Sequence, residues 1–171
     1  MPAVLRRQRC TANKKTMRYW LMKSEPDEAS IDDALAAKNC TLPWTGVRNY
    51  QARNFMRDQM QTGDGVLFYH SSCAEPGIAG IAEVASDSYT DPTQFDAKSP
   101  YCDPKSDRAN PRWLLVDVRA LKKTRLISLS ELRSHPELED MIILKRGNRL
   151  SVTPVTKSEW DFIVKQLAKG A

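Results

Sequence analysis

The feature that most constrains the fold is a tight turn between two apolar segments. "VLFYHS" (66–71) and "IAGIAEVA" (78–85) have the composition of strands, and "EPG" (75–77) turns the chain between them. A connection this short cannot cross over a sheet, so the two strands must be antiparallel neighbours. A doubly wound parallel sheet is therefore disfavoured.

The remaining elements are predicted from hydrophobic periodicity and from start and stop signals. Two helix starts carry a capping box, formed by Ser30 with Asp33 and by Thr156 with Glu159. The predicted strands are 18–23, 112–124 and 149–155, and the predicted helices are 30–38, 49–60, 128–140 with a break at Pro136, and 156–167. These elements predict a mixed α/β (α+β) fold, a small curved mixed sheet or open barrel with flanking helices.

Residues 86–111 form the longest segment without a periodic pattern. A loop of this length inside a compact domain is usually functional or disordered. Its two tyrosines and Phe95 predict that it folds over another part of the molecule.

The 171 residues suffice for one domain with its own core, which we expect to span residues 17–171. Residues 1–16 carry five basic residues, no acid and no usable periodicity, which predicts a disordered basic tail. Three interpretations stay open for this tail. It is a segment read from a start codon upstream of a natural Met17, a solvated arm that touches phosphate, or an organelle transit peptide.

The net charge of +5 comes from this tail, because residues 17–171 hold 21 basic and 21 acidic residues. The overall charge is therefore weak evidence for a nucleic-acid partner. Local basic patches in the folded part must carry that inference.

The spacing of the cysteines argues against a metal site and against a disulfide framework. Cys10, Cys40, Cys73 and Cys102 lie about thirty residues apart, and no CxxC pair exists. Four unpaired thiols fit a reducing cytoplasm. No apolar run approaches the ~18 residues of a membrane span. We expect no metal, no cofactor and no membrane partner, and we expect a monomer.

No arrangement of catalytic residues stands out. His70 and Ser71 are neighbours, but adjacent residues on a strand point to opposite faces, and no G-x-S-x-G segment is present. His70 is better explained as a satisfied structural histidine or as a ligand contact through a ring nitrogen. We therefore assign no catalytic residue and favour binding over catalysis.

Two segments bring basic and polar groups together, and the second also contains aromatic residues. "KSEP" (23–26) brings polar groups to the end of a strand, and is otherwise a solvated loop. "WTGVRNYQARNF" (44–55) places Arg48 and Asn49 at a helix start, where free backbone N–H groups favour an anion. Trp44 is either plain core or a ring that stacks on an unpaired base.

Further basic residues are candidates for phosphate contact. Arg53 and Arg57 lie four residues apart on one face of the predicted helix. "LKRGNRLS" (144–151) places Lys145 and Arg146 beside a glycine turn, which is either a surface turn or a phosphate contact.

Six segments together resemble the EVE domain family, which includes many small single-domain bacterial proteins. They are "YWLMKSEP" (19–26), "WTGVRNYQARNF" (44–55), "FYHSSCAEPGIAGIAEV" (68–84), "SPYCDPKS" (99–106), "PRWLLVDV" (111–118) and "RLSVTPVTKSEWDFIV" (149–164). The resemblance runs from about Tyr19 to about Leu167. Because it starts near Met17, it favours the upstream start codon for the tail.

The resemblance implies a PUA-like fold, a bent β-barrel with flanking helices. It also implies a reader of modified bases, chiefly modified cytosine in DNA, with the base flipped out. The related YTH domains hold a methylated adenine of RNA in an aromatic cage. Carried over, the base pocket comprises Lys23, Ser24, Glu25, Trp44, Val47, Arg48, Asn49, Tyr69, His70, Ser71, Arg149 and Ser151. The expected phosphate contacts are Arg53, Arg57, Lys145 and Arg146.

The sequence departs from the family pattern at two places in the long loop. Cys102 stands where an aromatic residue is expected, and "SYTDPT" (88–93) lacks the proline that often follows the tyrosine. Both departures lie in the long loop, so they affect the expected contacts between this loop and the ligand more than the expected pocket.

Elementary energetics predicts a modest preference for the modified base. A buried methyl group contributes ~0.8 kcal/mol, so discrimination on the methyl alone should be several-fold, and larger for a modification that forms a hydrogen bond. The alternatives are a reader of RNA, an enzyme that acts on a modified base with His70 as acid or base, and a module that binds a small molecule or protein.

Overall fold

The computed structural model describes residues 16–169. The expected basic tail therefore lies outside the described residues, apart from Thr16.

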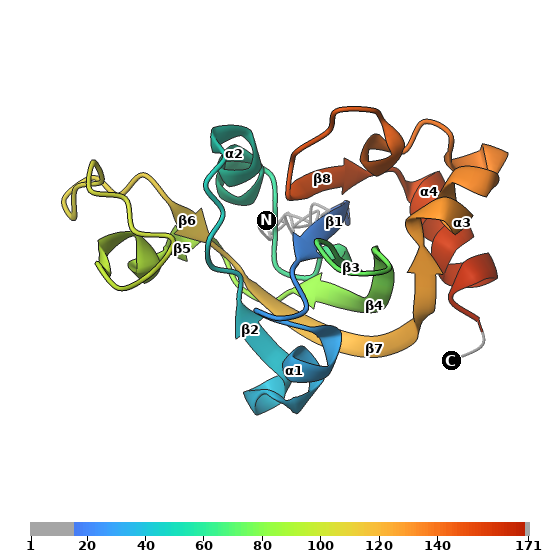
Figure 1. Ribbon diagram of the computed structural model, residues 1–171, viewed down its shortest axis with the longest axis horizontal. Helices are drawn as coiled ribbons and strands as arrows, with labels where there is room; N and C mark the ends of the chain where they lie inside the picture. The colour runs from blue at the N-terminus through green and yellow to red at the C-terminus, as the bar shows by residue number, and fades with distance from the viewer. Residues whose placement is uncertain (1–15, 170–171) are drawn as a thin grey trace, which may run out of the picture.

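A six-stranded mixed sheet forms the centre of the molecule, in the order β2-β7-β4-β3-β1-β8. Its strands are β1 (Tyr19–Ser24), β2 (Thr41–Pro43), β3 (Gly65–His70), β4 (Gly77–Val84), β7 (Asp117–Ser128) and β8 (Val152–Val155). β3 and β4 are antiparallel, as the tight turn predicts, and β1 runs parallel to β3. Figure 1 shows the long strand β7 bending along the sheet. The prediction of a curved mixed sheet is confirmed.

Four short α-helices flank this sheet. They are α1 (Ile31–Ala36), α2 (Tyr50–Asp58), α3 (Leu129–Ser134) and α4 (Lys157–Phe162), which continues as a π-helical turn (Ile163–Leu167). Both predicted capping boxes are present, at the starts of α1 and α4. The predicted break at Pro136 is also confirmed, because a separate 3₁₀ turn (Pro136–Leu138) follows α3. α3 and α4 lie together at one end of the molecule, and α2 lies near β8 (Figure 1).

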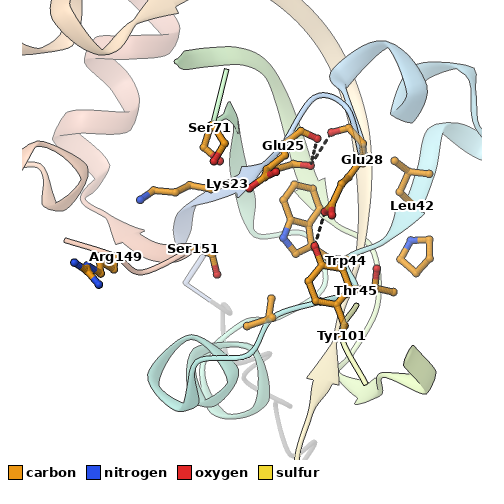
Figure 2. A pocket seen from close by; sticks show the side chains of 16 residues that line it. Lys23, Glu25, Glu28, Leu42, Trp44, Thr45, Ser71, Tyr101, Arg149 and Ser151 are labelled. Carbon is orange, nitrogen blue, oxygen red and sulfur yellow. Dashed lines mark hydrogen bonds between the residues drawn. The ribbon is translucent and has the colours of Figure 1, made fainter. Parts of the chain in front are cut away.

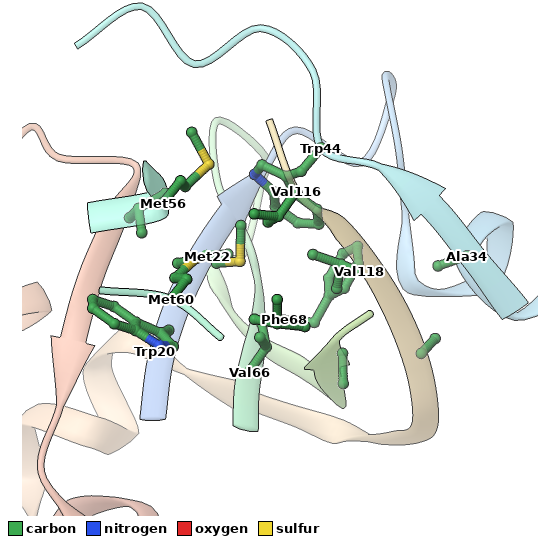
Figure 3. Packing of buried hydrophobic residues seen from close by; sticks show 14 of the residues in the cluster. Trp20, Met22, Ala34, Trp44, Met56, Met60, Val66, Phe68, Val116 and Val118 are labelled. Carbon is green, nitrogen blue, oxygen red and sulfur yellow. The ribbon is translucent and has the colours of Figure 1, made fainter. Parts of the chain in front are cut away.

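Both faces of the central strands are buried, which explains their nearly continuous apolar runs. Trp20 and Met22 of β1 belong to one apolar cluster, which also contains Trp44 and Met56 (Figure 3). Leu21 belongs to a second cluster, which packs against α3 and the end of α4. The alternation of side chains along β1 therefore contributes to two cores, one on each face of the sheet.

The long loop is ordered and carries structure that the sequence patterns do not predict. It contains β5 (Tyr89–Thr90) and a 3₁₀ turn (Pro92–Phe95), and β5 pairs with β6 (Leu114–Leu115). The buried Gln94 amide donates to the carbonyl oxygen of Trp113 at 2.8 Å, and its oxygen accepts from the Trp113 N–H at 3.2 Å. These bonds attach the loop to the start of the following strand.

Two strand predictions need correction. The expected strand 112–124 is divided at Val116 into β6 and β7, because the two parts pair with different strands: β6 with β5, and β7 with β2 and β4. The short strand β2 is not predicted, since three residues that end in Pro43 show no alternating pattern. Gly80 lies at a register shift between β4 and β7, where an added Cβ would be 2.4 Å from Ile31 Cδ1.

Candidate functional site

A polar cavity of about 400 Å³, called the first cavity below, opens where β1 ends (Figure 2). Its lining comes from the end of β1 and the next turn, from residues 42–47, from the segment after β3, from the long loop and from the segment before β8. Figure 2 shows Trp44 and Tyr101 on one side of the cavity, and Lys23 and Arg149 on the other.

The structure brings eight of the twelve expected pocket residues together around this cavity. They are Lys23, Ser24, Glu25, Trp44, Val47, Ser71, Arg149 and Ser151. Backbone hydrogen bonds fix their relative positions, because the Lys23 N–H donates to Ser151 O at 2.8 Å and the Ser71 N–H donates to Ser24 O at 2.9 Å. Three separate segments of chain are thus held at one sheet end.

Trp44 is both a core residue and a cavity residue. It is 6% exposed and stacks edge-to-face on Phe68, with ring centroids 5.1 Å apart. Its backbone N–H donates to Val116 O at 2.9 Å, which fixes the chain that carries it. Within residues 16–169, the indole N–H has no hydrogen-bond partner. This N–H is not one of the buried atoms that lack a partner, so it is open to the cavity and available to a ligand.

Tyr101, which is not one of the expected pocket residues, closes one side of the first cavity. Its hydroxyl donates to Glu28 Oε2 at 2.5 Å, and burial together with this bond raises its pKa to about 12. Its ring packs on Gly46, where an added Cβ would lie 2.8 Å from the ring carbons. Its signals in the sequence are its place in a loop too long to be a simple connection and in "SPYCDPKS", a segment that carries the family resemblance.

Arg48 is expected in the pocket, but its guanidinium is turned into the long loop. Its Nη1 donates to Asp91 Oδ2 at 2.9 Å, and its Nε and Nη2 donate to Tyr101 O at 2.9 and 2.6 Å. Asp91 is fully buried, and burial by itself would raise its pKa. Bonds from Thr93, Gly46 and Arg48 outweigh that effect and lower the pKa of Asp91. Arg48 therefore anchors the loop that carries Tyr101.

Three further expected pocket residues do not line the first cavity. Asn49 is the N-cap of α2, and its side-chain oxygen accepts from the Ala52 N–H at 3.1 Å. His70 accepts the Ile31 N–H on Nε2 at 3.1 Å, which makes it a satisfied structural histidine. Tyr69 points to the other face of β3 and lines a second, neighbouring cavity.

The expected phosphate contacts fall into two groups. Arg53 and Arg57 on α2 line neither cavity. Arg53 donates to Arg112 O at 2.9 Å, and Arg57 forms an exposed ion pair with Asp58 at 2.7 Å. Lys145 and Arg146 line the second cavity. The two groups therefore have different surroundings.

The lining of the first cavity has the chemistry of a binding site. Hydroxyl groups, carboxylates and two cationic side chains surround an aromatic wall. Partial burial lowers the pKa of Lys23. Within residues 16–169, no cluster of three potential metal ligands is found. No helix of that part of the chain is long and apolar enough to cross a membrane.

Comparison with known proteins identifies relatives over most of the chain. The family model described as EVE domain matches residues 18–166. Thymocyte nuclear protein 1 of Gallus gallus is 43% identical over 170 residues, covering 89% of this chain and 69% of that protein.

Solved structures give the same result. A human THYN1 protein in complex with 5-methylcytosine-containing DNA has a TM-score of 0.84 at 41% identity, covering 90% of this chain and 99% of that one. A hypothetical protein from Leishmania major has a TM-score of 0.83 at 47% identity, covering 88% and 94%. The resemblance that the sequence motifs show is confirmed.

Proposed function

This chain belongs to the EVE domain family, and we propose that it is a DNA-binding module that reads a modified cytosine. In this proposal, the base leaves the duplex and enters the first cavity. Trp44 and Tyr101 hold it from one side, while Lys23, Ser71 and Arg149 offer hydrogen bonds from the other. The observation that carries the proposal is the buried Trp44 indole, whose unpartnered N–H faces a polar cavity of about 400 Å³.

The relatives support DNA as the partner. The human THYN1 protein, 41% identical to this chain, was solved with 5-methylcytosine-containing DNA. This chain covers 99% of that structure. RNA remains the alternative polymer, because an aromatic wall and donors that read a base edge also suit an unpaired RNA base.

The energetic balance predicts weak binding with a modest preference. Extrusion of a base costs a few kcal/mol, whereas aromatic contact returns ~1–3 kcal/mol and bonds to the base edge return ~1–3 kcal/mol more. The binding free energy left after extrusion of the base is small. The affinity should therefore depend on phosphate contacts and decrease as the salt concentration rises. We propose Lys145 and Arg146 as phosphate contacts, with Arg57 as a weaker one because Asp58 neutralises it.

An enzyme that uses His70 is the second candidate, and the geometry disfavours it. The Nε2 lone pair already accepts the Ile31 N–H, and burial, the largest influence, lowers the pKa of the imidazole. His70 also does not line the first cavity. Turnover of a modified nucleoside by the native protein, lost in His70→Ala, would support the enzyme instead.

Compartment and assembly are also proposals. We propose a monomer in a reducing compartment. Cys40, Cys73 and Cys102 are free thiols, which suits either the cytoplasm or the nucleus.

The proposal is tested by fluorescence titration with short matched DNA duplexes. They carry cytosine, 5-methylcytosine or 5-hydroxymethylcytosine at one position. We expect the modified duplexes to bind several-fold more tightly, because a buried methyl contributes ~0.8 kcal/mol. Equal affinity for all three duplexes would contradict the proposal, and a parallel titration with modified RNA would then test the alternative.

A further inference from the structure

A second cavity of about 600 Å³ lies beside the first, where the parallel strands β1 and β3 both end. The turn after β3, helix α3 and residues 143–148 complete its walls. Lys23, Ser71 and Ser72 line both cavities, so these residues form the partition between them. A ligand in the second cavity would therefore lie next to a base held in the first.

The second cavity is strongly basic. Its lining includes Lys23, Arg133, Lys145 and Arg146, and no acidic residue. Lys145 forms an exposed ion pair with Asp140 at 3.0 Å. In the described part of the chain, none of the other three is in an ion pair. The cavity is therefore suited to an anion, in contrast to the first cavity, which includes Glu25 and Glu28.

Two polar groups in this lining have no hydrogen-bond partner among residues 16–169. The Nδ2 atom of Asn148 is buried, where a donor normally has a partner. The Tyr69 hydroxyl is not one of the buried unpartnered atoms, so it is open to the cavity although the residue as a whole is only 2% exposed. Burial raises the pKa of Tyr69, so the hydroxyl stays a donor at neutral pH. A ligand with acceptor oxygens would satisfy both groups.

Part of the lining is apolar, which distinguishes the cavity from a simple phosphate site. Pro76, Leu129, Ile143 and Leu144 contribute surface that an ion cannot cover. A sugar or a base would bury this surface, and a phosphate would engage the cations. A ligand that fits the whole cavity therefore combines a phosphate with a sugar or a base.

We propose that the second cavity binds a phosphorylated nucleoside, and that in the DNA complex this is the nucleotide next to the flipped base. The second half of this statement rests on the proposed function, because it requires a base in the first cavity. The reader would then contact two consecutive nucleotides, and the neighbour of the modified base would influence affinity. A free nucleotide is the other possible source of the same chemistry.

The test replaces single phosphates of the 5-methylcytosine duplex by uncharged methylphosphonates, on either side of the modified base. Wild type is compared with Arg146→Gln, Tyr69→Phe and Lys122→Gln. Lys122 is exposed on β7 and lines neither cavity, so it is the matched control for loss of charge. Arg146 is exposed, so its variant should fold even if the core variant Tyr69→Phe does not.

We expect one methylphosphonate position to weaken binding by wild type and by Lys122→Gln about tenfold, the effect of losing a charge-assisted hydrogen bond. Arg146→Gln should bind the duplex without methylphosphonates more weakly than wild type by a similar factor. Its affinity should not fall further when that one phosphate is replaced. Tyr69→Phe should also weaken binding. If wild type prefers the modified base but neither the replacements nor Arg146→Gln change affinity, the second cavity is not used.

A second readout is independent of base reading. Deoxycytidine 5′-monophosphate, deoxycytidine and inorganic phosphate are titrated into the labelled protein, while NMR follows the side-chain amide of Asn148. A shift with the mononucleotide alone supports the site even if wild type shows no preference for the modified base. Equal shifts with inorganic phosphate would reduce the site to a simple anion site. The absence of any shift, together with no methylphosphonate effect, would overturn the inference.

Discussion

Trp44 contributes both to the core and to the candidate site, and a conservative substitution separates the two roles. Trp44→Phe keeps an aromatic ring against Phe68 but removes the unpartnered indole N–H. We expect a folded protein whose affinity for the modified duplex falls about tenfold, because a bond worth ~1–2 kcal/mol is lost. Trp160→Phe is the matched control, since Trp160 stacks on Tyr19 and lines neither cavity. Equal losses in both variants, measured by titration, would contradict this role of Trp44.

Asp91 should make the stability of the fold depend on pH in the acid range. Its pKa is lowered in the folded state, so its stabilising effect is present above the unfolded value of about 3.9 and is lost as the pH falls through the folded value. Asp91→Asn should lower the free energy of unfolding at pH 7 by about 2–4 kcal/mol, because Arg48 loses its charged partner. The loss of stability between pH 7 and pH 3 should then be smaller than in wild type.

Urea titrations at the two pH values measure this effect. Asp58→Asn removes a carboxylate from an exposed ion pair with Arg57, and it should leave the free energy of unfolding nearly unchanged, because solvent screens such a pair. An Asp91→Asn protein as stable as this control would show that the Arg48–Asp91 pair does not anchor the loop.

Among the helices and strands, the sequence predicts the ones that are determined by residues close together in the chain. The capping boxes at Ser30 and Thr156 and the hairpin around Gly77 depend on neighbouring residues, and all three are present. β2 and β5 depend on pairing with distant strands, so no short window of sequence reveals them. Long-range pairing decides where such short strands form.

In the candidate site, too, features set by nearby residues are predicted and features set by distant residues are not. The motifs place eight residues around the first cavity because each lies at or near the end of a strand. The direction of Arg48 could not be predicted, because it depends on Asp91 and on Tyr101, which lies 53 residues further along the chain. Glu28 and Tyr101 meet across a still longer separation. Arg48 and His70 are thus misassigned because their partners are remote in sequence, whereas Asn49 caps its own helix through the nearby Ala52 N–H.

The position of the long loop should depend on Gly46, because Tyr101 of the loop packs on this glycine. Gly46 has φ +84, and a Cβ there would also lie 2.8 Å from the Tyr101 ring. Gly46→Ala should cost about 1–3 kcal/mol of stability from backbone strain. It should also displace Tyr101 and weaken binding of every duplex. Gly63→Ala is the matched control, because Gly63 has φ +94 but open space around it. It should lose stability without losing affinity, and equal losses of affinity in a titration would contradict the role of Tyr101.

At the scale of the whole molecule, one sheet end organises both cavities. β1 and β3 are parallel neighbours, so Lys23 and Tyr69 end at the same edge although they belong to distant segments. The first cavity is polar and of mixed charge, whereas the second is basic. Under the proposed function, this arrangement would separate recognition of a base from attraction of the backbone, as in most proteins that bind DNA.

That separation predicts how salt acts on affinity and on preference. Residues 17–171 hold equal numbers of basic and acidic residues, so attraction to DNA should come from local cations, chiefly those at the cavities, and from residues 1–16. Because log K falls with log salt by about 0.9 per phosphate contact, removal of the five basic residues in 1–16 should make the slope shallower by up to about 4.5. The affinity ratio between modified and unmodified duplexes should stay unchanged at every salt concentration, since the folded cavity sets it. Titrations of the full and shortened chains at several salt concentrations measure both quantities. A ratio that collapses when the tail is removed would place the recognition in the tail instead of the cavity.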